Sequence, residues 1–253
     1  MDLSDPTAPP SSSSALASDQ VSNPLPLLDV PRVVALATSF GSAGRELWED
    51  IRRLSVRFDT ARGTLERNVA WHHLVMSVGN FKRQGGYRLQ PVALDDLPMG
   101  VAADRFAVPG VEGLILDVEN PASWSALNSA MRGFASATTT TLLAALWADR
   151  HFVYDRRVHK AANGIRLASD SGLATTHDVT RDGRGPAEPT MSTYEVVRSW
   201  VRACGDELGL DIVAVERALY VLDQRVGKPP MTGRSWGEYS DTLRLALETV
   251  QPG

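Results

Sequence analysis

The residues with the clearest potential for chemistry lie in one stretch, Met131–Val158. It contains Gly133, a run of small residues, an apolar segment and then Asp155, which two arginines follow. A glycine turn that leads into a helix presents unpaired backbone N–H groups, which bind an anion such as a phosphate. A carboxylate at the boundary of an element can stabilise a developing positive charge or take a proton from water. The stretch therefore predicts a phosphate contact beside an acid–base group.

Within this stretch, Asp155 follows the triplet Gly133-Phe134-Ala135 by 20 residues, counted from Ala135. This arrangement resembles the helix-hairpin-helix DNA glycosylase superfamily, and within it the bacterial proteins with an 8-oxoguanine-glycosylase-like fold. The family places a Gly-hydrophobic-Gly hairpin before a helix, and an aspartate at this spacing. Two positions depart from the pattern: Ala135 replaces the second hairpin glycine, and Ala137 stands where bifunctional members carry a lysine.

The resemblance implies a monofunctional glycosylase. Such enzymes extrude the target nucleotide from the duplex into a pocket. Asp155 would stabilise the oxocarbenium charge at the sugar and activate water, which leaves an abasic site in an intact strand. A Schiff base at the hairpin is not expected, because no lysine occurs between Lys82 and Lys160. The base removed would be either a hypermodified phage cytosine, as in antiviral defence, or an oxidised or damaged base, as in repair.

The resemblance also assigns the contacts with DNA. Backbone and phosphate contacts are expected at Gly133, Ala135, Ala137, Thr138, Arg156, Arg157 and Lys160. Trp71, Phe81 and Tyr154 are candidates for the base pocket, because a flipped base needs aromatic faces. The expected partner is double-stranded DNA with a modified base, bound by a monomer. No cofactor is required, although a monovalent cation at the hairpin is compatible with the family.

The charge distribution is compatible with a DNA partner despite a net charge of −4. The first 30 residues hold four aspartates and no basic residue, which leaves 26 acidic and 26 basic residues from position 31 onward. Residues 150–166 carry five positive charges and one negative charge. This local patch predicts phosphate contacts, and a solvated charged face is the other interpretation.

Several other functions lack their signatures. The chain contains no P-loop, no Ser-His-Asp spacing motif and no zinc deaminase signature. Cys204 is the single cysteine, which excludes an internal disulfide and a four-cysteine metal site. His72 and His73 would point about 100° apart on a helix, so no metal site is expected. The absence of a long apolar run and of a secretory signal predicts a cytoplasmic protein that contacts no membrane.

Other interpretations of the same residues stay open. Asp155 could simply cap a helix or pair with its arginines. Asp223, within Leu222–Val226, repeats the Asp-x-Arg-Val pattern but has no glycine hairpin before it. A catalytically silent helix-hairpin-helix protein that binds DNA or acts as a scaffold would keep DNA affinity without releasing a base. In an unrelated helical enzyme or interaction module, the glycine turn would be a coincidence.

The predicted fold is mainly α, with a two-lobed helix-hairpin-helix DNA glycosylase domain at 31–253 behind a disordered tail at 1–30. The lobes would enclose a cleft with the hairpin and Asp155 on its wall. Helical spacing of apolar residues occurs at 43–57, 64–78, 136–147, 192–204 and 211–222, and a further helix that runs to Met131 begins at Ser123 or at Pro121. Prolines and glycines predict a short β or irregular segment near 85–120, with a strand at 113–118. Ser192 and Glu195 predict a capping box.

Overall fold

The computed structural model describes residues 27–81, 104–131, 134–169, 189–226 and 235–250. In these ranges it contains nine helices and one two-stranded sheet, so the predicted mainly α class is confirmed. The helices are α1 (Val30–Thr38), α2 (Ser42–Thr60), α3 (Thr64–Phe81), α4 (Pro121–Ala130), α5 (Ser136–Leu146), α6 (Arg156–Ala168), α7 (Met191–Leu208), α8 (Ile212–Val226) and α9 (Trp236–Glu248). The helix-hairpin-helix assignment stays a prediction.

The described part of the predicted β or irregular segment contains the sheet. Strands β1 (Arg105–Ala107) and β2 (Ile115–Asp117) pair antiparallel, with Phe106 opposite Leu116. Strand β2 lies inside the predicted strand at 113–118. Residues 82–103 lie outside the described residues.

The described structure includes residues before the predicted boundary at residue 31. Residues 1–26 of the predicted tail lie outside the described residues. Leu28 is buried in the core, and Asp29 caps α1 by accepting a hydrogen bond from the backbone N–H of Arg32 at 2.8 Å. Residues 27–30 therefore belong to the helical domain.

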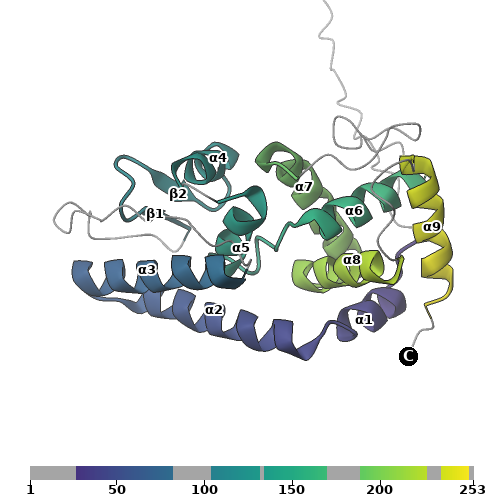
Figure 1. Ribbon diagram of the computed structural model, residues 1–253, viewed down its shortest axis with the longest axis horizontal. Helices are drawn as coiled ribbons and strands as arrows, with labels where there is room; N and C mark the ends of the chain where they lie inside the picture. The colour runs from purple at the N-terminus through teal and green to yellow at the C-terminus, as the bar shows by residue number, and fades with distance from the viewer. Residues whose placement is uncertain (1–26, 82–103, 132–133, 170–188, 227–234, 251–253) are drawn as a thin grey trace, which may run out of the picture.

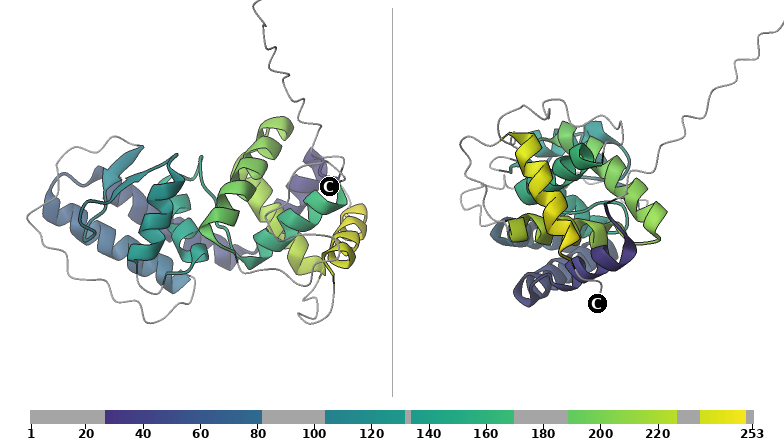
Figure 2. Two further views of the ribbon diagram at one scale, coloured as in Figure 1. Left: turned by 90° about the horizontal axis from the view of Figure 1, so that it is seen from above. Right: turned by 90° about the vertical axis from the view of Figure 1, so that its right-hand side faces the viewer.

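The helices fall into two groups along the long axis of the molecule (Figure 1). In the first group, α2 and α3 run side by side and both contact α5, while α4 packs against β2 and α5. In the second group, α6 contacts α7, α8 and α9, and α1 packs against α8. Figure 2 shows this second group from its end, with α9 in front. The chain passes between the groups from α1 to α2 and again in the loop that joins α5 to α6.

Helix α5 lies at the centre of the fold and is buried on nearly all sides. Every residue from Thr138 to Leu146 is buried, including four consecutive threonines. Their hydroxyls have local partners: Thr139 donates to Oδ1 of Asn128 at 2.8 Å, and Thr141 donates to the carbonyl of Ala137 at 2.7 Å. Buried hydroxyls with such partners cost little, which allows a polar run inside the core.

Helices α6 and α9 pack tightly at Gly164. A Cβ atom at this position would lie 2.3 Å from Cδ1 of Leu243 and 3.0 Å from Cε1 of Tyr239. The hydroxyl of Ser240 also donates to the carbonyl of Gly164 at 2.8 Å. A larger residue at position 164 would require the side chains of Leu243 and Tyr239 to move.

The N-terminus of α7 differs from the predicted capping box. The box is formed by Thr190 and Thr193. The hydroxyl of Thr190 accepts a hydrogen bond from the backbone N–H of Thr193 at 3.1 Å, and the hydroxyl of Thr193 accepts one from the backbone N–H of Thr190 at 2.9 Å. The prediction from Ser192 and Glu195 was two residues too late, because the helix begins at Met191.

Candidate active site

Asp155 is the N-cap residue of α6, as its predicted place at an element boundary requires. Its backbone is extended, and its Oδ1 accepts hydrogen bonds from the backbone N–H groups of Arg157 at 2.9 Å and Val158 at 3.2 Å. Aspartate is among the preferred residues at this position because it satisfies N–H groups that have no partner within the helix. The side chain is partly exposed. These bonds fix the carboxylate at the start of α6.

The residue before Asp155 is anchored to α5. The backbone N–H of Tyr154 donates to the hydroxyl of Thr140 at 3.0 Å, and this threonine is fully buried. The ring of Tyr154 is also buried, and its hydroxyl contacts Nδ1 of His159 and lies 3.1 Å from the hydroxyl of Thr193. Burial raises the pKa of Tyr154 above its ordinary value. Helix α5 thus positions the backbone from which the Asp155 side chain projects.

The start of α5, where the predicted hairpin leads into a helix, is partly described. Gly133 lies outside the described residues, so the predicted cation site at the hairpin stays a prediction. Ala135 is the exposed N-cap residue of α5 and provides no side-chain cap. Ala137 is partly exposed, whereas Thr138 is buried, so its side chain does not face a ligand at the surface. The backbone of this turn is what remains available for a phosphate.

Asp223 is the centre of a buried polar cluster between α6, α8 and α9. Its Oδ1 lies 2.7 Å from Nζ of Lys160 and accepts from the hydroxyl of Tyr239 at 2.6 Å. Its Oδ2 lies 3.5 Å from Nη1 of Arg157. The side chains of Asp223 and Lys160 are 2% and 9% exposed. Asp223 therefore joins three helices, which favours its structural interpretation.

The position of Lys160 corrects its prediction as a DNA contact. An amine that is buried and paired with a carboxylate cannot also reach a phosphate outside the protein. The two arginines that follow Asp155 are both partly exposed. Arg157 extends from the first turn of α6 towards α8. The predicted phosphate contacts of Arg156 and Arg157 remain compatible with the structure.

The predicted base pocket is corrected as well. The ring of Trp71 is 2% exposed and packs against Phe58 and Phe106, in the group of helices formed by α2 and α3. Tyr154 is inaccessible for the reason given above. Phe81 is partly exposed at the end of α3, where its ring lies 6.3 Å from that of Trp48. Trp71 and Tyr154 are thus core residues, and neither offers a face to a base.

Sequence reasoning missed two aromatic residues near Asp155. Tyr220 of α8 lies beneath the guanidinium of Arg157, whose carbon is 5.3 Å from the ring centre. The ring of Phe40 meets Tyr220 edge-on at 5.4 Å. Burial raises the pKa of Tyr220, and the negative charge of Asp155 raises it further. No sequence signal joins these residues, because Phe40 and Tyr220 come from opposite ends of the chain.

Comparison of the chain with protein-family models, with curated proteins and with solved structures finds no match. In the described part of the chain, no three His, Cys, Asp or Glu side chains are grouped so that they could hold a metal ion. Both His72 and His73 are exposed on α3. None of the described helices is long and apolar enough to cross a membrane.

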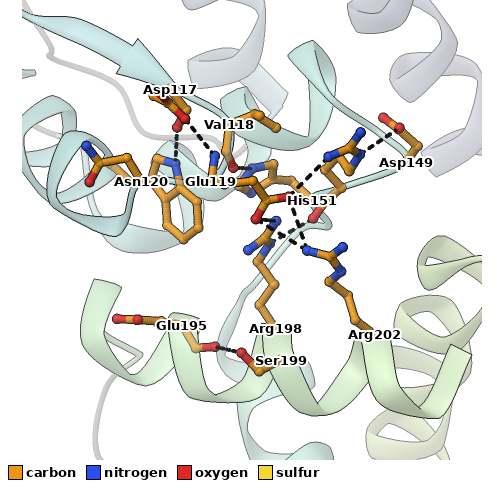
Figure 3. A network of polar contacts seen from close by, with 12 residues as sticks. Asp117, Val118, Glu119, Asn120, Asp149, His151, Glu195, Arg198, Ser199 and Arg202 are labelled. Carbon is orange, nitrogen blue, oxygen red and sulfur yellow. Dashed lines mark hydrogen bonds and ion pairs between the residues drawn. The ribbon is translucent and has the colours of Figure 1, made fainter. Parts of the chain in front are cut away.

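Glu119 ties the loop before Asp155 to α7 (Figure 3). Its carboxylate lies 2.9 Å from Nη2 of Arg198 and 3.2 Å from Nη1 of both Arg150 and Arg202. Arg198 also donates from Nε to the backbone carbonyl of Arg150 at 2.8 Å. Because Arg150 lies in the loop between α5 and α6, this network fixes that loop against α7.

Glu119→Gln is expected to lower the free energy of unfolding by about 1 kcal/mol at pH 7, a small value because the carboxylate is partly exposed. Burial alone would raise the pKa of Glu119, but the hydrogen bonds and charges of Arg198, Arg150 and Arg202 outweigh it and hold the pKa below 4.5. The stabilisation is therefore complete above pH 4.5 and is lost as the pH falls through the pKa of the folded state.

Urea unfolding at pH 7 and at several values below 4.5 measures this difference, which should shrink on acidification. Glu195→Gln, at an exposed position on α7, is the control and should unfold like the wild-type protein. If Glu119→Gln were as stable as the wild type at pH 7, the network would contribute nothing.

Two buried histidines predict that stability also depends on pH above the range in which Glu119 titrates. Burial, with a smaller contribution from Arg198, lowers the pKa of His151 to about 3, and burial with Arg156 lowers that of His159 to about 4. Both are neutral in the folded protein, but they gain protons in the unfolded chain below its ordinary pKa of 6.5. Stability should be complete above pH 6.5 and fall towards pH 4, with a slope approaching about 2.7 kcal/mol per pH unit.

Urea unfolding between pH 7 and pH 4.5 gives the slope. His159→Phe removes one titrating group and should reduce the slope to about half of its value. His72→Gln, at an exposed position, should leave the slope unchanged. A wild-type stability that is constant across this range would show that neither histidine stays neutral in the folded state.

Proposed function

We propose that the protein is a monofunctional DNA glycosylase in which Asp155 is the catalytic carboxylate. The observation that carries the proposal is the double anchoring of this residue. Its carboxylate accepts two backbone N–H groups at the start of α6, and the preceding residue is bonded to Thr140 of α5. A carboxylate held in this way is oriented before substrate binds, which is the requirement for electrostatic stabilisation of a transition state.

The chemistry follows from the position of one carboxylate beside a sugar. The bond between C1′ and the base nitrogen breaks, and the departing base takes the electron pair. The positive charge that develops on the sugar lies against the carboxylate of Asp155, which stabilises it. Water then adds to C1′ and its proton passes to the carboxylate or to solvent, while the departed base takes up a proton from solvent. The products are the free base and an abasic site in an unbroken strand.

The surroundings of Asp155 favour hydrolysis over strand cleavage by a lysine. A Schiff base requires an accessible neutral amine. Ala137 has none, and the amine of Lys160, the lysine in the described part of the chain, is held by Asp223 at 2.7 Å. The other two lysines, Lys82 and Lys228, lie outside the described residues.

The exposed backbone at the start of α5 and the two arginines after Asp155 support a DNA partner. Ala135 caps α5 without a side-chain hydrogen bond, and the N–H groups at the start of a helix are a common binding site for an anion. Arg156 and Arg157 lie at the first turn of α6 and are partly exposed. A monomer acting in the cytoplasm on duplex DNA, without a required cofactor, is part of the proposal. The base is either a hypermodified phage cytosine or an oxidised or damaged base.

The test is base release by purified protein from a panel of labelled DNA. The panel contains duplexes with oxidised, alkylated and deaminated bases, and phage DNA with and without glucosylated hydroxymethylcytosine. Strand breaks that appear only after hot alkali would support a monofunctional glycosylase and would identify its base. DNA binding without base release from any substrate would instead favour a catalytically silent DNA-binding or scaffold protein. Absence of both would overturn the proposal.

A further inference from the structure

The aromatic side chains that solvent reaches are few. Among the described Phe, Tyr and Trp residues, four are partly exposed, and they form two pairs. Trp48 pairs with Phe81, and Phe40 pairs with Tyr220. The second pair differs from the first because arginines flank it on both sides.

These flanking arginines and the pair form a continuous arginine–aromatic strip, which consists of Arg157, Tyr220, Phe40 and Arg217. The guanidinium carbon of Arg157 lies 5.3 Å from the ring centre of Tyr220. The rings of Tyr220 and Phe40 are 5.4 Å apart and meet at 70°. The guanidinium carbon of Arg217 lies 5.5 Å from the ring centre of Phe40. Arg157 lies on α6, Tyr220 and Arg217 lie on α8, and Phe40 lies between α1 and α2; α1 packs against α8 (Figure 1).

The end of the strip at Arg157 lies beside Asp155. Arg157 is its first member, and the backbone N–H of the same residue donates to Oδ1 of Asp155 at 2.9 Å. The pKa of Tyr220, raised mainly by burial, is raised further by the charge of Asp155, which agrees with this proximity. The candidate carboxylate and the strip therefore share one surface.

The chemistry of the strip suits nucleic acid. Guanidinium groups contact phosphates, and both guanidinium planes and aromatic rings stack on bases that are not paired. Of the acids near the strip, Asp223 and Glu216 are buried, at 2% and 7% exposure, and Asp155 is partly exposed, so the strip's own charged groups are its two arginines. Stacking requires a base whose face is free, which a fully paired duplex does not offer.

We propose that the arginine–aromatic strip binds the DNA strand beside the nucleotide on which Asp155 acts, with an unpaired base against Tyr220 and Phe40 and the adjacent phosphates against the arginines. This assignment rests on the proposed function, but it concerns binding, which can be measured without catalysis.

The test is fluorescence anisotropy with two probes of one sequence, a fully paired duplex and a duplex with one unpaired central nucleotide. All variants are made in the Asp155→Asn protein, in which base release is expected to be slow compared with the titration. Tyr220→Leu should weaken binding to the unpaired probe on the order of tenfold, the loss expected for one stacked base. Binding to the paired duplex should change by less than about twofold, because its bases are already stacked.

Conservative and distant variants serve as controls. Tyr220→Phe keeps the ring and should bind both probes as tightly as the Asp155→Asn protein without a further substitution, since stacking depends on the ring and not on the hydroxyl. Arg217→Gln should weaken binding to both probes and lower the slope of log affinity against log salt by about one. Arg53→Gln, at an exposed arginine on α2, should leave the slope unchanged.

The outcomes separate this inference from the proposed function. Equal loss on both probes for Tyr220→Leu, or no loss on either, would overturn the strip as a binding site for an unpaired base. Tyr220→Phe binding as weakly as Tyr220→Leu would also overturn it, because the ring would then not be responsible. If the expected losses occur but the wild-type protein releases no base from any substrate, the strip stands and the glycosylase proposal falls.

Discussion

Asp155→Asn is expected to release the modified base more slowly than the wild-type protein by a factor on the order of 10² to 10⁴. The amide cannot stabilise a positive charge on the sugar or accept a proton from water. Its Oδ1 can still accept the N–H groups of Arg157 and Val158, and Asn caps helices as well as Asp does. The variant should therefore unfold at the same urea concentration as the wild type. Single-turnover base release and urea unfolding of one preparation measure both quantities.

Two further variants separate catalysis from structure. Asp155→Ala should lose activity to the same extent and should also lose about 1 kcal/mol of stability, because the cap is removed. Asp223→Asn, at the other Asp-x-Arg-Val sequence, should still release the base under conditions in which it is folded. Near wild-type base release by Asp155→Asn would refute the role of this carboxylate, and loss of activity in folded Asp223→Asn would transfer that role to Asp223.

Asp223→Ala is expected to lower the free energy of unfolding by about 3–5 kcal/mol, the cost of leaving a buried charge without its partner. The substitution leaves the amine of Lys160, 9% exposed, without the carboxylate that lies 2.7 Å away. It also removes the acceptor of the Tyr239 hydroxyl, at 2.6 Å. The contacts between α6, α8 and α9 would weaken together. Urea unfolding at pH 7 measures the loss.

The double variant Lys160→Met/Asp223→Leu is the matched control. It replaces both charged groups with apolar side chains of similar size, so no unpaired charge stays buried. Such replacements are often neutral, and the double variant should recover most of the stability lost in Asp223→Ala. If Asp223→Ala lowered the free energy of unfolding by less than about 1 kcal/mol, the cluster would be accessible to water and would not hold the three helices together.

Apolar residues at helical spacing predict several of the helices. The segments at 43–57, 64–78 and 211–222 correspond to α2, α3 and α8. Helix α6 obeys the same rule, because Val158, Ala161, Ala162 and Ile165 recur at helical spacing and are buried, but the predicted helices do not include it. Its sequence is rich in charged residues, and its burial depends on tertiary contacts such as the Lys160–Asp223 pair and the approach of Leu243 to Gly164. Such contacts have no local sequence signal.

The candidate site also combines features that local sequence predicts with features that depend on tertiary packing. The boundary position of Asp155 follows from local sequence, because an aspartate before a helix is a local feature. The exposure of an aromatic ring is not local. Trp71 and Tyr154 are suitable in type but buried, whereas Tyr220 becomes accessible beside Asp155 only through the packing of α8 against α6.

The contact between α1 and α8 has a consequence for the order in which the protein can form. Helix α1 ends at Thr38, and its partner α8 begins only at Ile212. During synthesis, the apolar face of α1 therefore stays without its partner α8 until most of the chain has been made. Helices α2 and α3, by contrast, can pair as soon as both have emerged. Contacts between such distant segments form late. The strip that joins Phe40 to Tyr220 would be among the last surfaces to assemble, so a ribosome-bound chain lacking α8 would not yet have it.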